Sequence, residues 1–360
     1  MNDDRQSRLI SAMRFPLIVL VVIAHSAGSF DDPFIALSLD GWNVYHFSAE
    51  LLCRHLCSIG TCWFFVISGY FFFLNVTDPS IRWIPAKWKK RVRTLLIPYL
   101  IWNALDVLAI FVKMRLFAMK GIPAGENEIF TLQGGPLYWF ITGPADFPLW
   151  FLLALIIMTL LTPAIYPVFR RFPIASLVVL VVFYLAFPGE PYLVTMRGLF
   201  FFCLGAWAGI HKKSLLDFCQ RYKVLAIVGT VVLSVVATFR TGYPDHYFWR
   251  RSFYLFGMTA FMNLCYAMTR DNPRREARLI KLSASVFFIY AAHEIYILGW
   301  TKGIFVRVFG EGLSGAWIRL LGVPVIVLLV CLGLYYLLNC IMPRTLAFCC
   351  GGRSRPQMAA

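Results

Sequence analysis

Two polar side chains interrupt the first apolar segment of the chain at a spacing that fits one helix face. The stretch RLISAMRFPLIVLVVIAHS carries Arg14 and His25 eleven residues apart. At about 100° and about 1.5 Å per residue, eleven residues return to within ~20° of the same face and rise ~16 Å. Imidazole titrates near neutrality and guanidinium stabilises negative charge, so this stripe suits acid–base chemistry. The structural alternatives are a snorkelling arginine and a histidine held by a neighbouring helix or by headgroups.

A second polar pair lies in another apolar segment, SVFFIYAAHEIYILGW. Tyr290, His293 and Glu294 share one helix face with Ile297 by the i, i+3, i+4 spacing of an α-helix. An unpaired carboxylate is costly in hydrocarbon, so Glu294 is expected to face a partner or a polar cavity. A histidine beside a glutamate suits a proton-handling site, and a structural hydrogen bond between helices is the alternative.

Five cations precede a further apolar segment in KWKKRVRTLLIPY, which runs from Lys87 to Tyr99. Such a run is typical of a cytoplasmic stop signal in contact with lipid headgroups. It could also bind a phosphate-rich ligand, because Arg91 and Arg93 offer forked donors to phosphate oxygens. Both interpretations place the run at the cytoplasmic membrane surface.

Ser68 and Gly69 are small residues within the bulky segment CWFFVISGYFFFL. Small residues inside a spanning helix usually permit the close approach of a neighbouring helix. They could equally leave room for a thin ligand chain. Packing and binding both remain open for this pair.

The elements that must position these residues are membrane-spanning helices. Hydrophobic residues make up 59% of the 360 residues and charged residues 14%, whereas a soluble domain has about 25% charged residues. The apolar residues come in long blocks, which predict spans. The net charge of +16 is divided among short clusters between these blocks, which argues against a nucleic-acid partner and makes membrane lipid the expected partner.

We predict an all-α, polytopic transmembrane helical bundle with about ten spans and both termini in the cytoplasm. Of the 34 Lys and Arg residues, 22 fall in one set of alternate loops and 11 in the other, which leaves Arg14 inside a span. The positive-inside rule assigns the richer set, with both termini, to the cytoplasm. The predicted spans are 9–28, 56–75, 95–117, 147–168, 173–188, 197–211, 223–240, 252–269, 282–300 and 317–341.

Residues 1–345 are predicted to form a single domain, and residues 346–360 a short cytoplasmic tail. The acidic start and the lack of a small-residue cleavage site favour a retained first helix over a signal peptide. The ten scattered cysteines predict neither a disulfide framework nor a zinc site. No metal is expected.

Taken together, these motifs resemble the acyltransferase-3 family of bacterial membrane acyltransferases over most of the chain. Arg14 and His25 fit its R-x10-H signature in the first helix. Leu153 and Ala154 depart from the pattern, because many relatives carry charged residues there, and this speaks against a charged contact at that point. The other similar segments are FVISGY at 65–70, the R-x-R loop and proline-bearing helix at 91–99, LWFL at 149–152, FFFCLGAW at 200–207 and FIYAAH at 288–293.

The resemblance implies transfer of an acyl group, usually acetyl from acetyl-CoA, to a hydroxyl of a cell-surface glycan, glycolipid or related acceptor. His25 would remove the hydroxyl proton or carry the acyl group as a nucleophile. Arg14 would hold negative charge on the donor or assist the oxyanion, and His293 would be a further catalytic residue. Five residues are expected to bind the acyl-CoA: Arg91, Arg93, Ser68, Gly69 and Trp150.

The acceptor is expected at the outer mouth of the predicted channel. Glu50, His46 and Glu294 are the candidates for binding it, although exposed loop residues are more often merely solvated. The expected location is the bacterial inner membrane, and the oligomeric state stays open. Two other functions remain possible, namely a transporter or flippase of a lipid-linked sugar and a membrane scaffold whose polar groups join helices.

Overall fold

The described part of the chain consists of helices and the turns that join them, and it contains no strand. The computed structural model describes residues 2–27, 39–121, 138, 143–189 and 195–353. The prediction of an all-α fold is therefore confirmed for these residues. The helices are α1 Asn2–Ala24, α2 Gly41–Ala49, η1 Glu50–Leu56, α3 Ile59–Phe73, α4 Ile84–Arg91, η2 Val92–Leu96, α5 Ile97–Ala118, η3 Phe147–Leu149, α8 Trp150–Leu160, α9 Thr162–Arg171, α10 Pro173–Ala186, α11 Met196–Ile210, α12 Leu215–Arg221, α13 Lys223–Phe239, α14 His246–Thr269, α15 Pro273–Leu282, η4 Ser283–Ser285, α16 Val286–Ala292, η5 His293–Ile297, α17 Leu298–Phe309, α18 Leu313–Ile341 and α19 Pro343–Cys349.

Every predicted span contains helix, but its capacity to cross a bilayer varies. Five helical segments are long and apolar enough to cross, and two bent pairs raise the number to seven if each pair is one span. The helices α10 and α11 are apolar but have 14 and 15 residues, fewer than the ~20 that a straight span needs. The described residues thus hold five to seven candidate crossings, while the number ten and the cytoplasmic side of the termini stay predictions.

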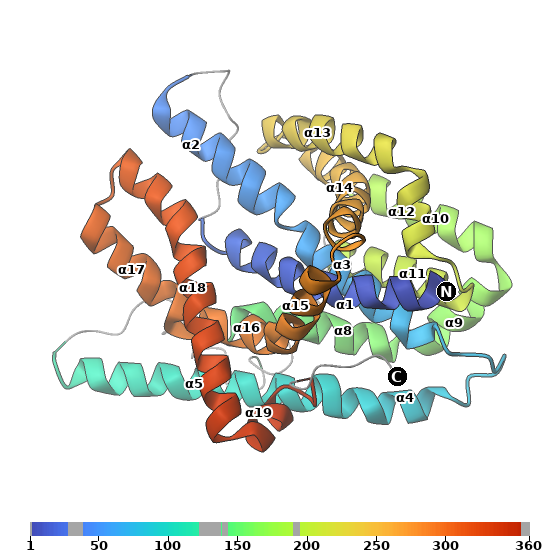
Figure 1. The fold of residues 1–360 in the computed structure, drawn as a ribbon, viewed down its shortest axis with the longest axis horizontal. Coiled ribbons are helices and arrows are strands. Elements are labelled where there is room, and N and C mark those ends of the chain that lie inside the picture. Colours follow the sequence, from blue (N-terminus) through green and yellow to red (C-terminus); the bar gives the residue numbers. More distant parts are fainter. Residues whose placement is uncertain (1, 28–38, 122–137, 139–142, 190–194, 354–360) are drawn as a thin grey trace.

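The first helix occupies the middle of the bundle. In Figure 1, α1 runs between the α4–α5 rod on one side and the α13–α14 pair on the other. It packs against α3, α14, α15, α16 and α18. Its predicted cytoplasmic end is fastened to α15 by ion pairs from Arg8, at 2.7 Å, and Arg5, at 3.9 Å, to the buried Glu276. A central α1 places Arg14 and His25 among other helices rather than at the rim.

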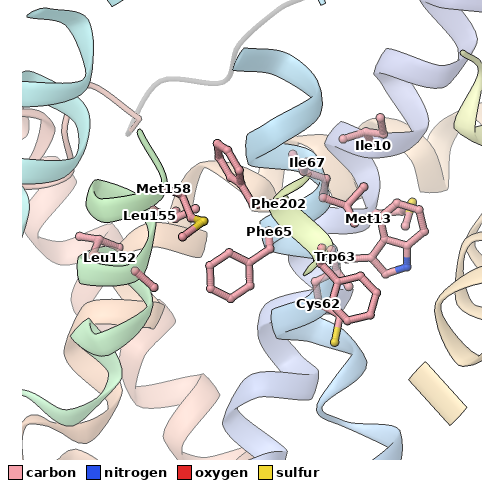
Figure 2. Packing of buried hydrophobic residues seen from close by; sticks show 14 of the residues in the cluster. Ile10, Met13, Cys62, Trp63, Phe65, Ile67, Leu152, Leu155, Met158 and Phe202 are labelled. Carbon is pink, nitrogen blue, oxygen red and sulfur yellow. The ribbon is translucent and has the colours of Figure 1, made fainter. Parts of the chain in front are cut away.

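The packing around α1 and α3 is dominated by large apolar side chains. Figure 2 shows Leu152, Leu155 and Met158 of α8 on one side of Phe65, with Met13 of α1 on the opposite side of α3. All five are at most 5% exposed. Packing this tight leaves few voids between the side chains of the core.

Glycines allow α3 and α11 to approach closely. A methyl group added at Gly205 would overlap the carbonyl oxygen of Val66, and one added at Gly69 would overlap that of Phe202. Gly205 and Gly209 on α11 form the small-xxx-small pattern of closely packed membrane helices. Gly69 therefore serves helix packing, and its predicted role in donor binding receives no support from this geometry.

We expect Gly205→Ala to destabilise the bundle, because overpacking a well-filled contact costs about 1–3 kcal/mol. Thermal unfolding of the purified protein in detergent should show a lower midpoint by several degrees. Gly333→Ala on α18 is the matched control, since nothing lies within 4 Å of a methyl group there. Equal midpoints for the two variants would contradict this account of the α3–α11 contact.

Candidate active site

His25 lies at the end of α1, where a lysine holds the last turn. The backbone N–H of His25 donates to the Val21 carbonyl at 3.3 Å, so the helical path extends one residue past Ala24. Lys302 Nζ, from α17, donates to the carbonyl oxygen of His25 at 2.6 Å. A cation at a helix C-terminus satisfies an open carbonyl and complements the helix dipole. This contact fixes the backbone from which the imidazole projects.

The imidazole of His25 pairs with the carboxylate of Glu294. His25 Nδ1 and Glu294 Oε1 are 2.7 Å apart, and their side chains are 20% and 26% exposed. When Nδ1 donates to the carboxylate, Nε2 of a neutral imidazole carries the free lone pair. The pair has the arrangement of a general base oriented by an acid. The sequence predicted Glu294 as an acceptor-binding residue, and the structure makes it a partner of His25.

His293 lies beside this pair and is fully buried. Its ring is edge-on to that of His25, with centroids 5.2 Å apart. Nδ1 faces the carbonyl oxygens of Tyr290 and Ile289 at 2.8 and 3.0 Å, so Nδ1 must carry the proton and donate. Nε2 is then an acceptor, and it has no hydrogen-bond partner among the described residues.

A break in the helix follows Glu294 directly. Ile295 has ψ 81°, and Tyr296 has φ 59°, a left-handed conformation that costs a non-glycine residue roughly 1–2 kcal/mol. The ring of Tyr296 stacks on Trp300 at 5.5 Å and lies under Lys113 at 4.8 Å. These contacts hold the strained turn, which ends the regular helix at the position of the Glu294 carboxylate.

Two further buried acids lie near Glu294, and the sequence motifs did not predict them. Asp106 on α5 and Asp146 before η3 are 8% and 2% exposed. Burial, together with the charges of Asp106 and Glu294, raises the pKa of Asp146 well above its usual range, so this carboxyl keeps its proton to higher pH and can donate. Both Asp146 oxygens and Asn103 Nδ2 lack hydrogen-bond partners among the described residues. Single acids far apart in sequence gave no motif that would have identified them.

A cavity of about 240 Å³ lies toward the predicted cytoplasmic end of the same helices. Three guanidinium groups line it, those of Arg14, Arg91 and Arg353, and none of its described lining residues is Asp or Glu. The rest of the wall is Ser68, Ser283 and mainly aromatic or aliphatic side chains, Tyr290 among them. His25 and His293 are not part of the wall. A positive, otherwise apolar cavity suits a phosphate attached to a less polar chain.

The structure separates the two arginines of the R-x-R motif. Arg91 faces the cavity, where its guanidinium lies over Phe72 at 5.3 Å and its Nη2 donates to the Ser68 carbonyl at 3.4 Å. Arg93 is exposed and is not among the lining residues. Residues two apart point to different sides of a helix, so one of the pair must face outward.

The third arginine comes from the segment predicted to be a tail. Cys349 O of α19 accepts a hydrogen bond from Trp102 Nε1 at 3.1 Å, which ties this segment to α5. Arg353 then lies over the Phe287 ring at 4.6 Å. Burial and the positive charges of Arg91 and Arg14 lower its pKa to about 10, so it stays protonated at neutral pH. Residues 354–360 of the predicted tail lie outside the described residues.

The remaining predicted site residues lie away from this cavity. Trp150 packs edge-on against Phe151 and under Arg197 at 5.7 Å, and it does not line the cavity. His46 lies on α2 beside Trp42, with ring centroids 5.9 Å apart. Glu50 is buried in η1, near Arg54 and Thr241.

The side chains around His25 could also bind a metal ion. His25, His293 and Glu294 each offer one ligand atom, and these atoms lie within 4.8 Å of one another. Direct pairing of His25 with Glu294 occupies one atom of each. That the His25 centre works without a metal stays a prediction.

Comparison with known proteins agrees with the motifs. The profile of the family described as "Acyltransferase domain" (Acyl_transf_3) matches residues 9–337. The chain belongs to the acyltransferase-3 family. The match runs from before Arg14 to Leu337 within α18 and therefore includes both histidines of the site.

One known protein is similar in sequence to part of this chain. The succinoglycan biosynthesis protein ExoH from Rhizobium meliloti (strain 1021) is 25% identical over 256 residues, which cover 69% of this chain and 66% of that protein. The match thus spans slightly less than two thirds of the relative's length. No solved structure matches the chain.

Proposed function

We propose that this member of the acyltransferase-3 family moves an acyl group from an acyl-CoA, with acetyl-CoA as the expected donor, to a hydroxyl of a surface glycan. The observation that carries the proposal is the 2.7 Å contact between His25 Nδ1 and Glu294 Oε1. A scaffold would need no oriented base. The relative's name refers to succinoglycan, and this favours a polysaccharide acceptor.

The arginine-lined cavity is the proposed docking site for the donor. Three like charges in one cavity repel each other, and an anion bound between them would relieve this repulsion. The phosphates of a coenzyme A supply such an anion and accept forked hydrogen bonds from guanidinium. The apolar wall around Phe151 and Phe287 would accommodate the pantetheine arm. That arm has to follow α1 for the ~16 Å between Arg14 and His25.

At the far end of this path, His25 acts as the base. Its Nε2 takes the proton of the acceptor hydroxyl, and the oxygen attacks the thioester carbonyl. The carbon–sulfur bond then breaks, and the imidazolium returns the proton to the departing thiolate. Glu294 stabilises the imidazolium in between. Asp106, Asp146 and Asn103 supply buried polar groups for the sugar hydroxyls.

Purified protein mixed with acetyl-CoA and a bacterial surface glycan should release free thiol and acylate the glycan, as measured by thiol titration and mass spectrometry. Arg353→Ala should raise the KM for the donor about ten- to a hundredfold with kcat nearly unchanged, because a charge-assisted hydrogen bond contributes roughly 1.5–3 kcal/mol. Arg344→Ala, an exposed arginine on α19, is the control. Glycan movement across vesicles without thiol release would favour a flippase instead.

A further inference from the structure

A second group of histidines and a glutamate lies where η1 meets the start of α14. Glu50 and His55 belong to η1, and His246 is the first residue of α14. Each side chain offers one ligand atom, and these atoms lie within 4.8 Å of one another. We propose that Glu50, His55 and His246 form a binding site for a divalent transition metal such as Zn²⁺, separate from the His25 centre.

The π-helical form of η1 brings two of these ligands together. Residues five apart in an α-helix point about 140° away from each other, given about 100° per residue. In a π-helix the i→i+5 register places them on one side, and such turns are frequent at functional sites. His55 Nδ1 accordingly contacts the Glu50 carbonyl oxygen at 3.1 Å. The local helix geometry thus aligns Glu50 and His55 toward α14.

His55 has a lone pair aimed into the group. Because Nδ1 faces a carbonyl oxygen, Nδ1 carries the proton and Nε2 is the acceptor. His55 is 0% exposed, and its Nε2 has no hydrogen-bond partner among the described residues. The Nε2 atom of His246 is also buried and has no hydrogen-bond partner among the described residues, and its ring centroid is 5.7 Å from that of His55. A buried acceptor without a donor is costly, and a bound cation would remove that cost.

The donor set matches the chemistry of zinc. Two imidazole nitrogens with one carboxylate oxygen form a common three-ligand zinc set, which leaves a fourth position for water. Metal-bound histidines usually donate their other ring N–H to a carbonyl or carboxylate, as His55 Nδ1 does here. Neutral imidazole also suits zinc better than magnesium or calcium.

Neighbouring charges limit the affinity of this site for a metal ion. Arg54 Nε lies 4.0 Å from Glu50 Oε2, and Thr241 Oγ1 donates to Oε1 at 3.5 Å, so these groups orient the carboxylate. The charges of Arg250 and Arg54 disfavour extra positive charge at His246, and that of Asp245 only partly offsets them. We therefore expect micromolar rather than nanomolar affinity. A bound ion would join segments about 190 positions apart and lock η1 against α14.

The test is a Zn²⁺ titration by calorimetry of the full chain, purified in detergent and stripped with a chelator. We expect one ion per chain and a zinc-dependent rise in the unfolding midpoint. His55→Ala and His246→Ala should weaken binding at least tenfold, while His46→Ala on the adjacent α2 should bind as the wild type does. Co²⁺ in place of Zn²⁺ should give the visible absorption of a four-coordinate site in the wild type.

The His25 group provides the second control, because it also offers three ligand atoms. His25→Ala should retain the ion if the η1–α14 site holds it. Loss of the ion in His25→Ala, with retention in His246→Ala, would overturn the proposal. So would wild-type protein that binds no Zn²⁺ at 100 µM, a measurement that does not depend on whether any variant folds.

Discussion

Replacing His25 with alanine should reduce acyl transfer at least a hundredfold while leaving the protein in the membrane at normal abundance. The change removes the base that takes the hydroxyl proton, and a positioned base contributes roughly 10²–10⁴-fold. It also leaves Glu294 without its imidazole partner at 2.7 Å. The effect should appear in kcat, because the proposed donor site around Arg14, Arg91 and Arg353 is untouched. Thiol release at saturating acetyl-CoA measures it.

A histidine outside the site supplies the control for this result. His211 follows α11, with its Nε2 3.0 Å from the Phe169 carbonyl oxygen, and it has no place in the proposed chemistry. His211→Ala should therefore keep its activity within about twofold. A fully active His25→Ala enzyme, with donor and acceptor both turned over, would refute the role of His25 as base.

The local part of the site could be predicted from the sequence because it follows helical geometry. The eleven-residue spacing of Arg14 and His25 needs only the helical repeat; α1 carries Arg14, and His25 follows its last residue, with its N–H still bonded to the Val21 carbonyl. The i, i+3 spacing likewise put Tyr290 and His293 on one face, while the break after Glu294 could not be anticipated. No rule of local sequence places a left-handed tyrosine inside an apolar helix.

The long-range part of the site depended on packing that a single sequence does not record. Arg353 reaches the cavity because α19 returns along α5, and a short basic tail gives no signal of such a path. Asp106 and Asp146 meet Glu294 from elements far apart in the chain. For Ser68 and Gly69 the sequence left both ligand binding and helix packing open. In the structure Ser68 lines the cavity, and Gly69 packs against α11.

Glu294→Gln should lower kcat roughly 10²–10⁴-fold with little change in the KM for the donor. Glutamine keeps the shape of the side chain but carries no charge, so it no longer stabilises the imidazolium. Its amide can also present N–H to His25 Nδ1, which favours the tautomer with the proton on Nε2 and removes the base. Steady-state kinetics with both substrates varied separately would measure the change, and Glu311→Gln, an exposed glutamate after α17, is the control.

The kinetic pattern distinguishes the two roles open to Glu294. An orienting carboxylate acts through His25, so its loss lowers kcat at every acceptor concentration. A carboxylate that binds the sugar contributes to acceptor binding. Its loss therefore raises the KM for the acceptor, and a high acceptor concentration restores the rate. Recovery of the rate at high acceptor concentration would contradict the proposal that Glu294 orients His25. It would favour the acceptor-binding role that the sequence predicts for Glu294. Because the 2.7 Å contact joins Glu294 to His25, we expect no such recovery.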